Sequence, residues 1–133
     1  MQKDIKGILT QKVRLDQSAL NMGSGTLEVF STPSLVAFVE KTCWMSIDEF
    51  LEEGQTTVGT KMELSHLKAT PIGFNVTCHS NLLEVDGAKL VFEFEVTDEK
   101  ELISKGRHER FIVDKEKFQN KVDSKKEKPE ING

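Results

Sequence analysis

The chain has 133 residues, of which 30% are charged and 37% belong to the apolar set, and its formal net charge is −4. This size and composition are typical of one globular domain, and the acidic balance argues against binding to nucleic acid or anionic lipid. No apolar run approaches the ~20 residues that span a bilayer, and the first residues lack the apolar core of a signal peptide. We therefore expect a cytoplasmic protein that binds neither membrane nor nucleic acid.

Little regular structure is expected before residue 31. A short alternation of apolar and polar residues in Gly7–Leu15 predicts an edge strand. Two glycines and a serine make Asn21–Gly25 a loop. The alternation resumes in Thr26–Ser31, which predicts a short strand that leads into the next element.

A long helix is predicted for residues 31–53. Ser31 or Thr32 can cap the free amides of its first turn, and Pro33 suits the first helical position because it has no N–H to leave unpaired. Gly54 is expected to end the helix, just past its last turn.

One residue of this helix interrupts its apolar side, which at about 100° per residue holds Val36, Val39, Cys43, Ile47, Phe50 and Leu51. Glu40 lies within that apolar stripe. A carboxylate there is costly to bury unless it is paired, neutralised or open to a cavity. Either Glu40 is a satisfied structural residue, or it faces an active-site pocket, where perturbed carboxylates concentrate.

The sequence after the helix changes to a period of two, which predicts strands. Gly59 interrupts the first run and indicates a bulge or the close approach of another group. The dipeptide Asp86-Gly87 predicts a tight hairpin turn. The predicted strands are Thr56–Leu67, Phe74–Ser80, Leu82–Val85, Lys89–Thr97 and Glu101–Val113.

One long helix and about five strands predict an α+β domain over residues 1–118. The apolar face of an antiparallel sheet needs a cover, and only this helix can supply it. We therefore expect a hotdog fold, in which a curved antiparallel sheet wraps a central helix. Residues 119–133 are polar and rich in lysine, which predicts a disordered tail.

Five segments together resemble the conserved blocks of the fluoroacetyl-CoA thioesterase-like family of hotdog proteins, and the resemblance covers roughly residues 10–118. The segments are Gly23–Val29, Ser31–Val36, Thr56–Thr60, His66–Gly73 and Gly106–Arg110. The resemblance implies hydrolysis of a short acyl-CoA thioester by a homodimer, or a tetramer of paired dimers, with helices side by side and active sites at the subunit interface.

By position, the resemblance places the catalytic group of the family on Thr32, Glu40 and His66. It also places a backbone contact near the thioester on Gly59 and a supporting arginine on Arg110. It implies no metal and no redox cofactor, since CoA enters as part of the substrate. His79 and His108 match no catalytic position of the family.

The chemistry of this group leaves alternatives open. Glu40 could activate a water or attack the thioester directly, and Thr32 could be a plain helix cap. A non-catalytic acyl-CoA binding or sensing module is the alternative function, with a hydratase or dehydratase as a third. In the family, discrimination of the fluorinated acyl group is attributed to a bulky aromatic lid near the start of the helix, but the corresponding loop Asn21–Thr26 has only Met22 as a large side chain. The specificity for fluoroacetyl is therefore not transferred, and a small acyl-CoA is the expected substrate.

Overall fold

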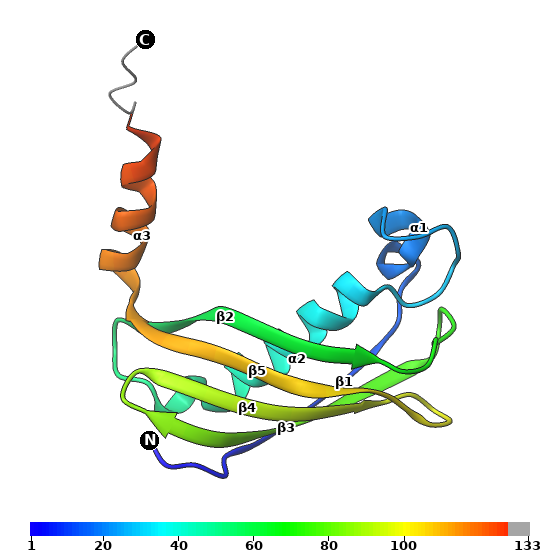
Figure 1. Cartoon of the computed structure of the whole chain (residues 1–133), viewed down its shortest axis with the longest axis horizontal. Coiled ribbons are helices and arrows are strands. Elements are labelled where there is room, and N and C mark those ends of the chain that lie inside the picture. The colour runs from blue at the N-terminus through cyan, green and yellow to red at the C-terminus, as the bar shows by residue number, and fades with distance from the viewer. Residues whose placement is uncertain (128–133) are drawn as a thin grey trace.

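The computed structural model describes residues 1–127 and confirms the predicted architecture of one long helix and a five-stranded antiparallel sheet. The strands lie in the order β1-β3-β4-β5-β2, so β1 and β2 form its edges (Figure 1). The elements are β1 (Lys6–Lys12), α1 (Ala19–Met22), α2 (Thr32–Ile47), β2 (Gln55–His66), β3 (Asn75–Asp86), β4 (Lys89–Thr97), β5 (Leu102–Asp114) and α3 (Lys115–Asp123), with short 3-10 turns at Leu15–Gln17, Asp48–Phe50 and Ser124–Lys126.

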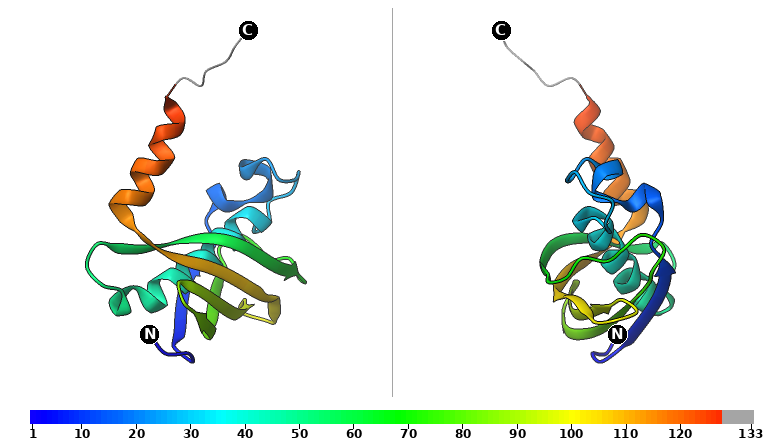
Figure 2. Two further views of the ribbon diagram at one scale, coloured as in Figure 1. Left: turned by 60° about the vertical axis from the view of Figure 1, so that its left-hand side comes forward. Right: turned by 90° about the vertical axis from the view of Figure 1, so that its right-hand side faces the viewer.

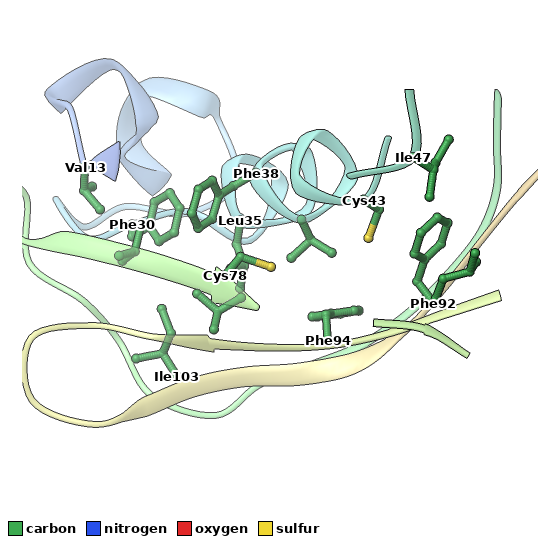
Figure 3. Close-up of a cluster of buried hydrophobic side chains, with 14 of the residues drawn as sticks. Val13, Phe30, Leu35, Phe38, Cys43, Ile47, Cys78, Phe92, Phe94 and Ile103 are labelled. Carbon is green, nitrogen blue, oxygen red and sulfur yellow. The ribbon is translucent and has the colours of Figure 1, made fainter. Parts of the chain in front are cut away.

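The core lies between α2 and the concave side of the sheet, which curves around the helix (Figure 2). Val39, Cys43 and Ile47 of the predicted apolar side are fully buried, and Leu35 is buried beside them, whereas Phe50, also predicted on that side, is 50% exposed. Cys43 and Cys78 are free thiols inside this core (Figure 3). Burial raises the pKa of both thiols, that of Cys78 to about 11. The two cysteines therefore act as small apolar residues.

The ends of α2 differ from the prediction in two details. Ser31, one of the two predicted caps, is the N-cap, because its Oγ accepts a hydrogen bond from the amide of Ser34 at 3.1 Å. Thr32 is the first helical residue, so Pro33 is the second and not the first. The α-helix ends at Ile47 and gives way to a 3-10 turn, so it is shorter than the predicted 31–53. Glu52 and Glu53 would have lain at the negative end of the helix dipole, which disfavours acidic residues there.

Strand β2 carries the predicted bulge. Gly59 pairs with Arg110 of β5, but the next pair joins Lys61 to Glu109, so Thr60 is the extra residue. A bulge of one residue changes which side chains share a face. Beyond it, His66 pairs with Ser104 and points to the same side of the sheet as Gly59.

The predicted hairpin is confirmed, and the two strand segments before it form one continuous strand, β3. Gly87 adopts φ +60° in the turn between β3 and β4. The prediction of a strand in Thr26–Ser31 is wrong. That segment makes only two isolated bridges, Ser18 with Phe30 and Val29 with Pro71.

The predicted disordered tail differs in its first residues, which are helical. Asp114 caps α3 by accepting a hydrogen bond from the amide of Lys117 at 2.9 Å. Helix α3 stands away from the sheet (Figure 1). Residues 128–133 of the predicted tail lie outside the described residues. Among residues 1–127 no helix has both the length and the apolarity to cross a bilayer.

Gly106 is required for the pairing of β5 with β2. A Cβ at this position would overlap the carbonyl oxygen of Glu63 and lie 2.9 Å from the Cα of Leu64. These atoms are backbone of a paired strand and cannot move without breaking hydrogen bonds. We expect Gly106→Ala to lower the free energy of unfolding by about 1–3 kcal/mol, measured by urea denaturation. Lys105→Ala, at an exposed neighbour, is the control; equal stability of the two variants would contradict this account.

Candidate active site

The structure brings Thr32 and His66 together. Thr32 Oγ1 lies 2.8 Å from Nδ1 of His66, which joins the first turn of α2 to the end of β2. Because Ser31 supplies the cap, the hydroxyl of Thr32 is available for this contact. The interpretation of Thr32 as a plain cap is therefore wrong. We call these two residues the threonine–histidine pair.

The electrostatics of the pair favour a neutral imidazole. Burial lowers the pKa of His66, and its Nε2 is buried with no hydrogen-bond partner in the described part of the chain. If Nδ1 accepts from Thr32, Nε2–H is a free donor. If Nδ1 donates to Thr32 instead, the threonine hydroxyl is the free donor. In either tautomer the pair offers one proton donor to a ligand.

The structure also brings Glu40, Gly59 and Arg110 together. A Cβ built on Gly59 would lie 2.9 Å from Oε2 of Glu40 and 3.2 Å from Nη1 of Arg110. Glu40 is half-buried, and it forms no ion pair or hydrogen bond with any side chain of residues 1–127. The carboxylate and the guanidinium therefore flank a small space that exists because residue 59 has no side chain.

Arg110 is held in this place by neutral acceptors. Its Nε donates to Oγ1 of Thr57 at 2.8 Å and its Nη2 to the carbonyl of Thr57 at 3.0 Å. Its Nη1 donates to Nε2 of His108 at 3.1 Å. The side chain is only 7% exposed, and burial lowers its pKa while the charge of Glu40 opposes that shift. The guanidinium is thus a fixed positive charge, and the neighbouring carboxylate of Glu40 forms no ion pair with it.

His108 belongs to this group although the sequence analysis matched it to no catalytic position. It is 1% exposed, and Cε1 lies 3.2 Å from the Cβ position of Gly59. The spacing His108-Glu109-Arg110 carries the signal that could have found it, because residues two apart in a strand share a face. We call Glu40, Gly59, His108 and Arg110 the glutamate–arginine cluster.

The two groups lie apart within one chain. Thr32 and Glu40 are eight residues apart on α2, which is about 12 Å along the helix axis. The predicted site residues therefore form two separate groups, and Thr32, Glu40 and His66 do not meet within one chain. A hollow of about 960 Å³ lies elsewhere, on the sheet face turned away from α2, and is lined by charged residues such as Glu93, Glu95 and Arg107.

A curved antiparallel sheet around one long helix is the hotdog fold, which this chain shares with thioesterases of solved structure. The family model described as fluoroacetyl-CoA-specific thioesterase, FlK, matches residues 13–116. The chain belongs to this family. It is an acyl-CoA thioesterase, an enzyme that hydrolyses acyl-CoA thioesters.

The similar proteins agree with this assignment. The fluoroacetyl-CoA thioesterase of Streptantibioticus cattleyicolor is 36% identical over 98 residues, which cover 74% of this chain and 70% of that protein. A solved structure of the fluoroacetyl-CoA thioesterase FlK superposes with a TM-score of 0.89 at 27% identity, covering 97% of this chain and 98% of that one. A Thermus thermophilus thioesterase superfamily member, at 24% identity and a TM-score of 0.87 over 95% of this chain and 93% of that one, shares the fold.

Filling the space at Gly59 tests whether it is part of the active site. In Gly59→Ala the new methyl group would stand between Glu40 and Arg110. The atoms it meets are the ends of side chains, which can shift, so we expect the variant to fold. We expect kcat/KM for acyl-CoA to fall by about 10²-fold, the scale on which small misplacements act, in a thiol-release assay. Wild-type activity in a folded Gly59→Ala would place the reaction elsewhere.

Proposed function

We propose that the enzyme hydrolyses a short-chain acyl-CoA thioester with Glu40 as the base or nucleophile and with Thr32 and His66 assisting. The observation that carries this proposal is the position of Glu40, which is half-buried, unpaired within residues 1–127 and next to the open face of Gly59. A carboxylate in this setting is free to react, whereas a structural glutamate would be bonded to its neighbours.

The proposed reaction needs only side chains, backbone amides and water. Glu40 removes the proton from a water that attacks the carbonyl carbon, or its carboxylate attacks that carbon itself and water then cleaves the anhydride. The carbon–sulfur bond breaks, the acid is released and the proton passes to the CoA thiolate. Both routes require an ionised Glu40, and neither uses a metal or a redox cofactor.

The threonine–histidine pair is suited to stabilise negative charge on the carbonyl oxygen of the thioester. Thr32 lies at the first turn of α2, where the free amides carry a partial positive charge that favours a developing oxyanion. The one free donor of Thr32 and His66 adds a hydrogen bond from a neutral group. In this proposal the glutamate–arginine cluster carries out the nucleophilic step, and the threonine–histidine pair stabilises the oxyanion.

The separation of the two groups supports a homodimer. β2 is an edge strand in residues 1–127, so a second copy can pair with it. A two-fold axis near Met62 would set Gly59 opposite His66 of the partner subunit in an antiparallel register. Trp44, one turn beyond Glu40 on α2, is 39% exposed and would be covered by the partner's helix. Each active site would then combine Glu40 of one chain with Thr32 and His66 of the other.

The substrate we propose has a small acyl group, and specificity for fluoroacetyl is not part of the proposal. The segment Asn21–Thr26 has no aromatic residue to close over the acyl group, and Met22 is exposed. We also propose that the enzyme works in the cytoplasm, a reducing compartment that suits its two free thiols.

Replacing Glu40 tests the proposed chemistry. We expect Glu40→Gln to lower kcat by about 10²-fold or more with little change in KM, because the carboxylate acts in the transition state. Thiol release from acetyl-, propionyl- and butyryl-CoA is the measurement, and Glu49→Gln, at an exposed position, is the control. Unchanged turnover in Glu40→Gln would refute the mechanism. Binding without turnover, even in the wild-type protein, would support the acyl-CoA binding module instead.

Mixed dimers test whether the two groups that form one site come from different chains. Glu40→Gln and His66→Ala are each expected to be inactive. A mixed dimer of one Glu40→Gln chain and one His66→Ala chain has one of its two sites with both residues intact. Random pairing after co-expression makes about half of the dimers mixed, so roughly a quarter of the wild-type activity should return. If both residues served within one chain, no mixture would recover activity.

A further inference from the structure

His108 is a buried histidine that the proposed reaction does not use directly. Its imidazole bridges two elements: Nδ1 lies 2.8 Å from the carbonyl oxygen of Lys61 in β2, and Nε2 lies 3.1 Å from Nη1 of Arg110 in β5. Its ring also stacks on Phe92 of β4, with ring centroids 6.3 Å apart and planes inclined by 28°. The ring is therefore fixed in both position and orientation.

The two hydrogen bonds determine the tautomer of His108. A carbonyl oxygen only accepts, so Nδ1 must carry the proton. A guanidinium only donates, so Nε2 must be the lone-pair nitrogen. The imidazole is thus neutral with its proton on Nδ1. Burial and the adjacent charge of Arg110 both lower the pKa of His108, in agreement with this geometry.

We propose that His108 is a positioning residue for Arg110. This proposal rests on the function proposed for the Glu40 site. By accepting from Nη1, the imidazole holds the guanidinium over the face of Gly59, separate from Glu40. The carboxylate then stays free to react, and the charge of Arg110 faces the space beside Gly59. A carboxylate in place of His108 would pair with the arginine and cancel that charge.

Two amide variants separate the two bonds of His108. In His108→Asn the amide nitrogen can occupy the place of Nδ1 and donate to Lys61, but nothing reaches Arg110. In His108→Gln the longer side chain can place its oxygen where Nε2 accepts from Arg110. We expect kcat for acetyl-CoA to fall by about 10-fold or more in His108→Asn and by no more than about 3-fold in His108→Gln, with KM nearly unchanged in both.

A double-mutant cycle shows whether His108 acts through Arg110. In an Arg110→Gln background, we expect His108→Asn to cause no further loss of kcat, since its target is already absent. A purely structural role would add its own loss in both backgrounds. His79→Asn, on the exposed outer face, is the control and should leave kcat unchanged.

The outcomes separate this proposal from the function it rests on. Equal kcat values for His108→Asn and His108→Gln, or additive losses in the cycle, would overturn the role of His108. If Glu40→Gln keeps wild-type turnover, the proposed function itself fails. Unfolding midpoints are measured for every variant, and His108→Leu replaces His108→Asn if the latter does not fold, since it fills the space without an acceptor.

Discussion

The single extra residue in β2 is the constraint on which the candidate site depends. Gly59 and His66 are seven positions apart, and in a regular strand an odd separation puts two residues on opposite faces of the sheet. Because Thr60 is bulged, both residues face α2, where they meet Glu40 and Thr32 respectively. The hydroxyl of Thr60 bonds the carbonyl of Glu109 at 3.3 Å, which supports the bulge from the partner strand.

The site also depends on keeping two opposite charges apart. A half-buried carboxylate and a buried guanidinium this close gain several kcal/mol of Coulomb energy if they pair at low dielectric. In this chain the arginine instead has neutral partners, Thr57 and His108, and no ion pair forms between it and Glu40. The guanidinium is satisfied in its hydrogen bonds without its charge being neutralised. Such an arrangement costs stability, which is typical of preorganised active sites.

Much of this arrangement could be predicted from the sequence, because it is local. The apolar period of residues 31–53 located α2 and exposed Glu40 as an anomaly. A glycine within an alternating run located the bulge. Other features depend on contacts between distant residues and carry no local signal. Ser31 and Thr32 are equally able to cap a helix, and only the position of His66, 34 residues later, decides which hydroxyl is free.

The sequence-based predictions that were wrong also failed because they concern contacts between distant residues or single capping residues. Thr26–Ser31 alternates like a strand, but its backbone meets only single residues of other segments, so no ladder forms. The polar composition after residue 118 suggested disorder, whereas the cap at Asp114 starts a helix that composition alone does not reveal. His108 matches no catalytic position in the sequence, because a histidine within a strand stands out only once Arg110, two positions on, is known to be buried beside it.

In the proposed dimer, the division of the site would link activity to assembly. Within one chain, the group suited to attack and the group suited to the oxyanion lie about 12 Å apart along α2, a distance no side-chain rotation closes. Both groups face the same side of the sheet, next to an edge strand whose hydrogen bonds are free for a second copy. A monomer would therefore hold two incomplete parts of the site, one near Thr32 and one near Glu40. In the dimer that we propose, a sheet continued across two copies would join them, cover Trp44 and complete both sites at once.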